Sequence, residues 1–439
     1  MSGQEPITGR TARAIAASVE ARVNAGTLGA GERLPSVRAL AGELAVSPGT
    51  VAGAFAELRR RGVVVSRPRS GMRVADTPPL GPRRARVVPA GVRDLAAGNP
   101  DPGLLPDVLA AFRRLDGPPR LYGEAAVDPG LATVAAAALR ADGLDPAHLC
   151  VVNGALDGIE RALAAHLGGG DAVAVEDPGF AAVVDVVRAL GLTPLPVAVD
   201  ERGMGPENLR AALGEGARAV VITPRGQNPT GAALDGARAR ELRATLATAP
   251  EVLLVEDDHL GPVAGVPALT LSGGLERWVA VRSTSKWLGP DLRLAVLAGD
   301  KTTVGRVEGR QAVGPGWVST LTQRAVAALW ADEDTAALGE QAATIYAGRR
   351  RALLAALASH NLAARGPSGL NVWLPVADEE GAVAGLLAAG WAVSAGARFR
   401  LRSEPAIRIT VATLRPEEAG RLAADLADVL RPGGRTRAA

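Results

Sequence analysis

The chain has 439 residues, of which 47% are hydrophobic and 22% charged, as expected for a globular protein with two or three domains. No apolar run approaches the roughly 18 to 20 residues of a membrane-spanning helix, and the first residues lack a signal-peptide pattern, so we expect a cytoplasmic protein. The single cysteine, Cys150, excludes an intrachain disulfide, and the four scattered histidines show no metal-ligand spacing.

The charge is unevenly distributed along the chain. Residues 1–86 carry 14 arginines against 6 acidic residues, whereas the remainder carries 35 basic and 40 acidic residues. Between a basic head and an acidic body, residues 77–93 contain four prolines and no helical periodicity, which predicts an extended linker. We predict the following organisation: a first domain at 1–75, a linker at 76–93, a body at 94–432 with a small C-terminal subdomain from about 340, and a flexible tail at 433–439.

The head contains the pattern of two short helices joined by a tight turn. Ser36 fits the N-cap of a first helix, Ser47 fits the N-cap of a second, and Pro48 occupies the first helical position, where a missing N–H has no cost. The second helix, roughly 48–61, is expected to bury three apolar side chains, those of Val51, Phe55 and Leu58. This pattern predicts a helix-turn-helix.

Two short strands, at 63–65 and 72–74, are predicted to follow and to enclose the loop "SRPRSG". A basic loop beside a helix-turn-helix is suited to DNA, because the second helix fits a major groove while arginines neutralise phosphates. The stretch "LPSVRALAGELAVSPGTV" resembles the GntR-type winged helix, and the resemblance covers about 70 residues. It implies double-stranded DNA as a partner, with contacts from Arg38, Ser47, Thr50, Arg67 and Arg69.

The head departs from the GntR pattern at one place. Pro48 and Gly49 stand where many members carry a polar or basic residue, so base specificity is expected to rest on Thr50 and the wing. The alternative interpretation is a small helical domain whose arginines form a solvated face.

The body alternates short apolar runs with longer amphipathic segments. The runs are "AVAVE" (172–176), "RAVVIT" (218–223), "VLLVE" (252–256), "WVAVR" (278–282) and "LAVLA" (294–298). Such runs are typical of buried parallel strands, so we predict an α/β fold with a mainly parallel sheet covered on both faces. Ligands bind such sheets at the carboxyl ends of the strands, and polar side chains follow four of the runs: Asp177, Asn228, Asp257 and the segment 283–286.

Lys286 is one of only two lysines in the chain, with Lys301, among 47 arginines. A lysine amine condenses with an aldehyde, whereas a guanidinium stays protonated and is not nucleophilic. Ser283, Ser285 and Arg293 could hold the phosphate of an aldehyde cofactor, and Asp257 could pair with a pyridine nitrogen. These groups together predict a site for pyridoxal 5'-phosphate.

Residues 94–432 resemble the fold-type I aminotransferases. Seven motifs occur in the family's order: "YGEAAVDPGL", "NGALDGIERAL", "VEDPGF", "TPRGQNPTG", "VEDDHL", "STSKWLGPDLRLA" and "AIRITVATL". The resemblance implies that Lys286 forms the Schiff base and that Asp257 pairs with the pyridinium nitrogen. It also implies that Asn228 binds the phenolic oxygen, that Phe180 stacks on the ring and that Arg408 clamps an effector carboxylate.

The resemblance further implies a phosphate site made by the two serines, Arg293, the helix-opening amides of Ala155 and Leu156, and Tyr122 from a second subunit. The family pattern has a tyrosine near the position of His259. His259 could bind the phenolic oxygen as that tyrosine does, or it could face away. Other departures are Ala155, which lacks a hydroxyl, Leu156 in place of glutamine, and the absence of an arginine after Phe180. We therefore expect at most weak transaminase activity.

A GntR-type winged helix joined to an aminotransferase-like body is the arrangement of the MocR-type regulators, which the whole chain resembles. This resemblance implies a head-to-tail dimer that senses pyridoxal phosphate, an amino acid or an amine and alters promoter binding. Vitamin B6 metabolism and amino acid metabolism are the two candidate processes under its control. The alternative is a working aminotransferase with an accessory DNA-binding head.

Overall fold

The computed structural model describes residues 6–67, 71–75 and 87–431. By their internal contacts the residues form two compact units: residues 1–86 with the short segments 167–172 and 185–194, and the rest of the chain. Most of the predicted linker, the whole predicted tail and the wing residue Arg69 lie outside the described residues.

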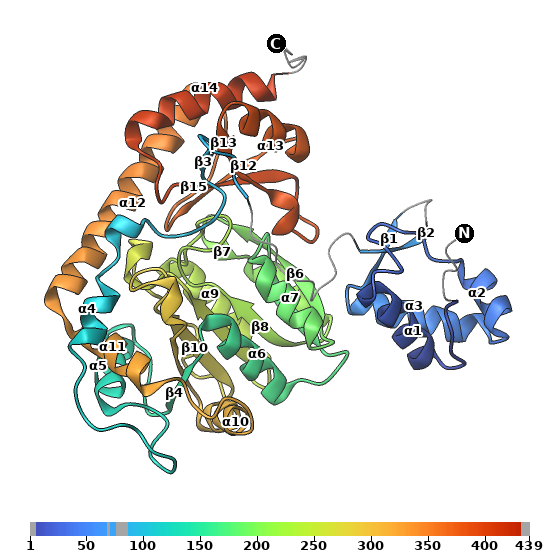
Figure 1. The fold of residues 1–439 in the computed structure, drawn as a ribbon, viewed down its shortest axis with the longest axis horizontal. Coiled ribbons are helices and arrows are strands. Elements are labelled where there is room, and N and C mark those ends of the chain that lie inside the picture. Colours follow the sequence, from blue (N-terminus) through green and yellow to red (C-terminus); the bar gives the residue numbers. More distant parts are fainter. Residues whose placement is uncertain (1–5, 68–70, 76–86, 432–439) are drawn as a thin grey trace. The chain divides into compact units, whose positions relative to one another are not determined.

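The first unit is a helix-turn-helix followed by a hairpin (Figure 1). Its elements are α1 (Ala12–Asn24), α2 (Val37–Leu44), α3 (Pro48–Arg60), β1 (Val64–Arg67) and β2 (Gly71–Val74), the two strands pairing antiparallel. The predicted caps are confirmed: the Ser36 side chain accepts the N–H of Ala39 at 3.1 Å, and the Ser47 side chain accepts the N–H of Thr50 at 3.1 Å.

The turn between α2 and α3 passes through Ala45, whose φ of 49° is left-handed, and the two helices are bent by 118°. The three apolar side chains predicted for α3, Val51, Phe55 and Leu58, are at most 3% exposed in the core of the unit. Among the described residues no single helix is long and apolar enough to cross a membrane, although α2 and α3 taken as a bent pair pass that test of length and composition.

The second unit is built on an eight-stranded sheet with the order β4-β11-β10-β9-β8-β5-β6-β7. The strands are β4 (Leu149–Val152), β5 (Ala172–Asp177), β6 (Thr193–Asp200), β7 (Gly203–Met204), β8 (Ala217–Ile222), β9 (Leu253–Asp258), β10 (Trp278–Ser283) and β11 (Ala295–Gly299). All five apolar runs are strands, and β8, β9 and β10 are parallel to one another.

One strand differs from the expectation of parallel strands. β11, the run at 294–298, lies antiparallel to both β10 and β4. The reason is the length of the connection: only residues 284–294 join β10 to β11, and a parallel crossover needs a dozen or more residues, usually with a helix. The sheet is therefore mixed.

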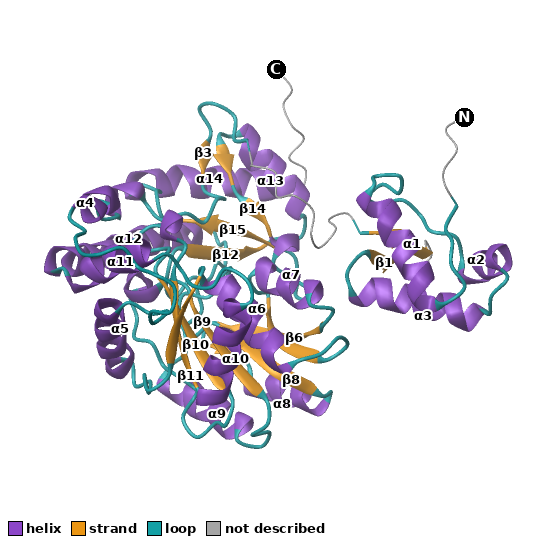
Figure 2. Cartoon of the chain, turned by 60° about the horizontal axis from the view of Figure 1, so that its bottom comes forward, coloured by secondary structure: helices purple, strands orange, loops and turns teal. Residues whose placement is uncertain are grey.

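Helices lie beside the sheet (Figure 2). They are α4 (Val108–Arg113), α5 (Pro129–Ala141), α6 (Ala155–His166), α7 (Ala181–Ala189), α8 (Pro206–Gly214), α9 (Gly236–Leu246), α10 (Lys301–Ala312) and α11 (Thr320–Ala331), with single 3-10 turns at Pro102–Leu104, Gly261–Ala264 and Pro290–Leu292. β9 is buried along its whole length: its first three residues are apolar, as is typical of a central strand, and its last three are the buried carboxylates Glu256, Asp257 and Asp258.

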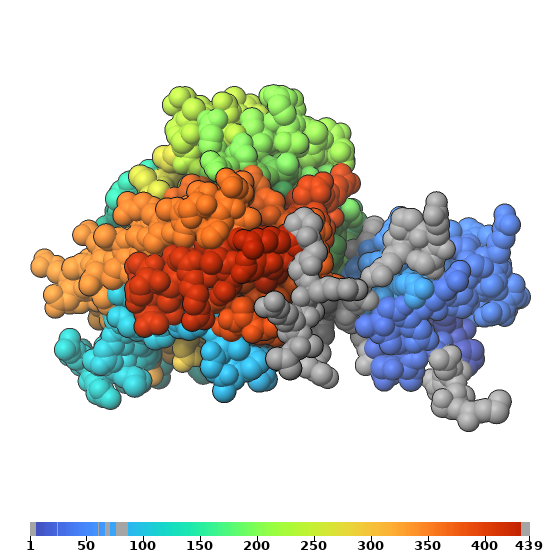
Figure 3. Space-filling model, turned by 90° about the horizontal axis from the view of Figure 1, so that it is seen from above, coloured from blue at the N-terminus to red at the C-terminus, as the bar shows by residue number. Residues whose placement is uncertain are grey.

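The C-terminal part forms a smaller α/β layer. It contains α12 (Glu333–Ser359), β12 (Asn371–Pro375), α13 (Glu379–Ala388), β13 (Trp391–Ala392), β14 (Ser394–Ala395), β15 (Ala406–Thr410) and α14 (Ala419–Leu430), with 3-10 turns at Gly396–Arg398 and Pro416–Glu418. β12, β15 and β14 form an antiparallel sheet, and Figure 3 shows these segments, coloured orange to red, gathered on one side of the second unit.

A strand from the beginning of the second unit completes this layer. β3 (Arg93–Asp94) pairs in parallel with β13, from almost 300 residues later in the chain. Leu95, the next residue, is fully buried in the core of the C-terminal layer. The first residues after the predicted linker thus belong to the C-terminal part of the fold.

Candidate cofactor site and nucleic-acid interface

The candidate site begins where β9 and β10 end. Asp257 is the second-to-last residue of β9. β10 ends at Ser283, and Lys286 lies in the tight turn that follows. Because the two strands are parallel neighbours, their carboxyl ends lie at one edge of the sheet. The amine of Lys286 and the carboxylate of Asp257, both predicted as cofactor ligands, therefore lie at the same edge of the sheet.

Lys286 lies in a partly buried position in which its Nζ donates a hydrogen bond to the carbonyl of Gly98 at 2.6 Å. Burial, and to a smaller extent the positive charge of Arg408, together lower the pKa of the amine to about 8. A lysine with this pKa is partly neutral near physiological pH, and a neutral amine is the nucleophilic form.

Asp257 is 3% exposed, and its Oδ1 has no hydrogen-bond partner among the described residues. Burial, followed by the negative charge of Asp258, raises the pKa of this carboxyl to about 7. A buried acceptor without a donor is costly to leave in that state. The protonated ring nitrogen of pyridoxal phosphate is a donor of the kind this atom lacks.

His259 lies next to this carboxylate, with its Nδ1 3.9 Å from Oδ2 of Asp257. This Nδ1 is also buried without a hydrogen-bond partner among the described residues. Burial, with a contribution from the charge of Lys286, lowers the pKa of the imidazole to about 4, so the ring is neutral. His259 thus lies beside Asp257, while its contact with the phenolic oxygen stays a prediction.

Arg408 extends from β15 toward Asn228. It donates to Asn228 Oδ1 at 3.0 Å and to the carbonyl of Ala96, and its guanidinium lies 4.7 Å from the centre of the Phe399 ring. Since Arg408 also lowers the pKa of Lys286, the predicted carboxylate clamp, the predicted phenolic-oxygen ligand and the amine form one group.

Arg293, one of the predicted phosphate ligands, lies at the start of α6. Arg293, with a left-handed φ of 45°, donates to the carbonyl of Asn153 at 3.1 Å. Gly154 has a φ of +90°, and a Cβ there would lie 2.5 Å from a nitrogen of Arg293, so only glycine permits this approach. α6 begins at Ala155, and the first amides of a helix lack intrahelical partners, which suits them to phosphate.

The two predicted serine ligands are adjacent, with Ser283 Oγ donating to Ser285 Oγ at 3.1 Å. Phe180 is partly buried in the loop between β5 and α7. Tyr122 is 91% exposed and packs edge to face on Trp317. The assignments of Phe180 to ring stacking and of Tyr122 to the partner's site stay predictions.

Asp257 and Asp258, which are consecutive in β9, differ in their partners, and the sequence did not reveal this difference. Asp258 is fully buried and is held by Arg225, whose Nη2 lies 2.7 Å from Oδ2, and by Arg282 at 3.4 Å. These cations lower the pKa of Asp258 to about 2, against the effect of burial. Successive side chains of a strand point to opposite faces of the sheet, so Asp257 and Asp258 have different surroundings.

Other residues near the strand ends hold loops in place. The carboxylate of Asp177 accepts the backbone N–H groups of Leu401, Arg402 and Ser403 at 2.7 to 3.0 Å, which fixes a loop of the C-terminal layer. Glu176, fully buried, accepts from Thr223 at 2.9 Å. The signal for both was present in "VEDPGF", but their partners lie far along the chain.

The candidate DNA contacts lie in the first unit. Arg38 is exposed on α2, and the Oγ atoms of Ser47 and Thr50 lie 2.9 Å apart at the start of α3. Arg67 ends β1 and thus belongs to the hairpin. No group of three or more metal-ligating side chains occurs among the described residues.

Comparison with known proteins places both units. Residues 11–74 match the bacterial regulatory proteins of the gntR family, and residues 90–426 match aminotransferase class I and II. The chain is 40% identical over 428 residues to the vitamin B6 salvage pathway transcriptional repressor PtsJ of Salmonella typhimurium, covering 97% of this chain and 99% of that protein.

More distant similarities agree with this relationship. The pyridoxine biosynthesis transcriptional regulator PdxR of Corynebacterium glutamicum is 29% identical over 248 residues, 53% of each chain. The fold resembles LysN, an α-aminoadipate aminotransferase of Thermus thermophilus solved with N-(5'-phosphopyridoxyl)-L-leucine, with a TM-score of 0.69 and 22% identity over 78% of this chain and 92% of that one.

The residues fit the cofactor of this fold, pyridoxal 5'-phosphate, which when bound supplies an aldehyde to the amine and a phosphate to the helix start. A GntR winged helix precedes a fold-type I aminotransferase domain in one chain, and the match to the transcriptional repressor PtsJ spans both domains, with 97% of this chain covered. The chain therefore belongs to the MocR-type regulators of the GntR family.

Proposed function

We propose that the protein is a transcriptional regulator of vitamin B6 metabolism that senses pyridoxal phosphate. The observation that carries the proposal is the unpartnered, buried Oδ1 of Asp257 at the same sheet edge as a lysine of lowered pKa, in a chain that begins with a DNA-binding domain. The vitamin B6 regulators among its relatives support the choice of pathway.

In this proposal the protein acts in the cytoplasm as a head-to-tail dimer. Support comes from apolar side chains that the single chain leaves exposed in the second unit: Leu109, Leu121 and Leu321 are each at least 58% exposed, and Tyr122 is 91% exposed. Exposed apolar side chains near one another are typical of association surfaces. Tyr122 would then reach the partner's phosphate site.

The test is binding of the full-length protein to its own upstream DNA with and without pyridoxal phosphate. We expect the dissociation constant to change by roughly 5-fold or more, the lower range of allosteric coupling. Equal affinities at saturating cofactor, judged by visible absorbance, would show that the cofactor is not the signal.

A second candidate function is turnover of an amino acid. Arg408 favours it, because a sensor of pyridoxal phosphate alone has no use for a carboxylate clamp. Mixing the loaded protein with single amino acids in a stopped-flow spectrophotometer decides between the two. Rapid, repeated conversion of the cofactor to its amine form would support an enzyme, whereas binding without turnover would support amino acid sensing.

A further inference from the structure

Two donors of the cofactor site are hydrogen-bonded to the backbone that follows the predicted linker. Lys286 Nζ donates to the carbonyl of Gly98 at 2.6 Å, and Arg408 donates to the carbonyl of Ala96. Gly98 is also close to the guanidinium itself, since a Cβ there would lie 3.3 Å from one of its nitrogens. We call residues 93–98 the anchor segment.

The anchor segment is fixed at its other end by the C-terminal layer. The N–H groups of Arg93 and Leu95 donate to the carbonyls of Gly390 and Ala392 at 2.9 and 2.8 Å. The Arg93 side chain donates to Glu418 at 3.0 Å. The anchor segment, which starts at the last residue of the predicted linker, is thus held at one end by strand pairing and at the other by the two ligand-binding side chains.

Occupation of the site would remove donors from this segment. Condensation of the Lys286 ammonium with an aldehyde forms a C=N bond and releases one water, so Nζ keeps one of its three N–H groups. A carboxylate bound by Arg408 would compete with Asn228 and Ala96 for Nη1 and Nη2, the terminal nitrogens that now donate to them. Only Ser394, whose Oγ donates at 3.1 Å, would then remain on the Ala96 carbonyl.

We infer that the anchor segment transmits occupancy of the site to the linker. A bound ligand competes with the backbone carbonyls of this segment for hydrogen bonds from Lys286 and Arg408, so the segment joined to the linker loses hydrogen bonds when the ligand binds. The inference rests on the proposed function and names its regulation. It requires no contact between the head and the body, because the covalent chain itself carries the change.

Asp94 offers a way to disturb the segment without touching the ligand-binding groups. This exposed side chain accepts the N–H groups of Ala96 and Ala97 at 2.9 and 3.2 Å and so fixes the turn that presents the two carbonyls. Asp378 is a matched control: it is also exposed and accepts one N–H, that of Gly381 at 2.9 Å, at the start of α13.

The experiment combines two measurements on the full chain, with pyridoxal phosphate as the probe. The first is hydrogen exchange of peptides covering 93–98, with the amides of Arg93 and Leu95 as reporters. The second is the ratio of DNA dissociation constants with and without cofactor in the wild type, Asp94→Ala and Asp378→Ala.

We expect exchange in the anchor segment of the wild type to change on cofactor binding. We also expect the DNA ratio, roughly 5-fold or more in the wild type and in Asp378→Ala, to fall below about 2-fold in Asp94→Ala. Unchanged exchange at full cofactor occupancy overturns the inference, and so does an Asp94→Ala ratio equal to that of the wild type. A wild-type ratio of one contradicts the proposed function instead, and the exchange measurement still decides the inference.

Discussion

The environment of Lys286 explains why an amine stands there in a chain that otherwise uses arginine. A partly buried ammonium beside Arg408 loses its proton readily, as its pKa of about 8 shows, whereas a guanidinium would remain charged in the same place. Lys301, the other lysine, is exposed at the start of α10, where either cation would serve.

Substitutions of Lys286 distinguish the role of its positive charge from the role of its reactive amine. We expect Lys286→Ala and Lys286→Arg to lose the visible absorbance of lysine-bound cofactor completely, because neither side chain can condense with the aldehyde. Absorbance spectra after addition of pyridoxal phosphate and gel filtration measure this. Lys301→Arg is the matched control and should keep the wild-type spectrum; a normal spectrum in Lys286→Arg would refute the assignment.

The lowered pKa of Lys286 predicts the pH dependence of cofactor capture. The neutral amine reacts, so the rate for the cofactor-free protein should rise with pH and level off above about 8. With an ordinary lysine pKa of about 10.4, the rise would continue beyond pH 10. Stopped-flow absorbance at a series of pH values measures the midpoint, and one near 10 would show that burial and Arg408 do not act as described.

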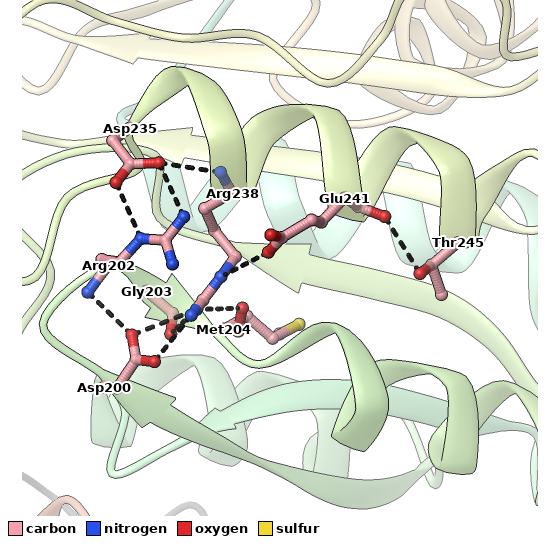
Figure 4. Close-up of polar contacts among 8 residues, drawn as sticks. All are labelled: Asp200, Arg202, Gly203, Met204, Asp235, Arg238, Glu241 and Thr245. Carbon is pink, nitrogen blue, oxygen red and sulfur yellow. Dashed lines mark hydrogen bonds and ion pairs between the residues drawn. The ribbon is translucent and has the colours of Figure 1, made fainter.

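At the scale of elements, α9 is joined to the β6–β7 turn by a buried arginine (Figure 4). Arg238 donates to Asp200 at 2.7 and 3.0 Å and to the carbonyls of Gly203 and Met204 at 3.1 and 2.9 Å. Its side chain is 6% exposed, whereas that of Asp200 is 53% exposed. The carbonyls therefore depend on Arg238 more than the carboxylate does.

Truncation of Arg238 should destabilise the second unit. Arg238→Ala leaves two carbonyls without their donor, and we expect a loss of about 2 to 4 kcal/mol in the free energy of unfolding. Urea denaturation followed by circular dichroism measures the change. Arg240→Ala, at an exposed position of the same helix, should change stability by no more than about 0.5 kcal/mol. Equal effects of the two substitutions would contradict this account of the contacts.

Local patterns predicted two helices and the hairpin of the head and five strands of the body, and long-range contacts account for part of what they missed. The apolar runs located β5, β8, β9, β10 and β11, because buried strands need continuous apolar sequence. The direction of β11 and the partners of Asp177 and Asp258 depend on segments that only the folded chain brings together. The carbonyls of Ala96 and Gly98 had no signal at all, since a backbone oxygen is the same at every residue.

At the scale of the whole molecule, the basic head and acidic body predict a salt-dependent partner. DNA affinity should fall steeply with salt, with a slope of the logarithmic plot of roughly 0.9 for each phosphate neutralised. Arg38→Ala should weaken binding and reduce that slope by roughly 0.9, the amount expected for the loss of one phosphate contact. Fluorescence anisotropy at several salt concentrations measures both, with Arg310→Ala, exposed in the second unit, as the control. A slope unchanged by Arg38→Ala would remove it from the interface.

The pairing of β3 with β13 has a consequence for biosynthesis. Arg93 cannot meet Trp391 until nearly nine-tenths of the protein has left the ribosome, whereas the helices and hairpin of the head are all encoded before residue 75. At a synthesis rate of roughly 5 to 20 residues per second, the head can therefore fold tens of seconds before the strand that pairs with β3 has been made. A nonsense codon between the head and β13 would therefore leave the head encoded in full but without the strand pair that holds residues 93 and 94 in the C-terminal layer.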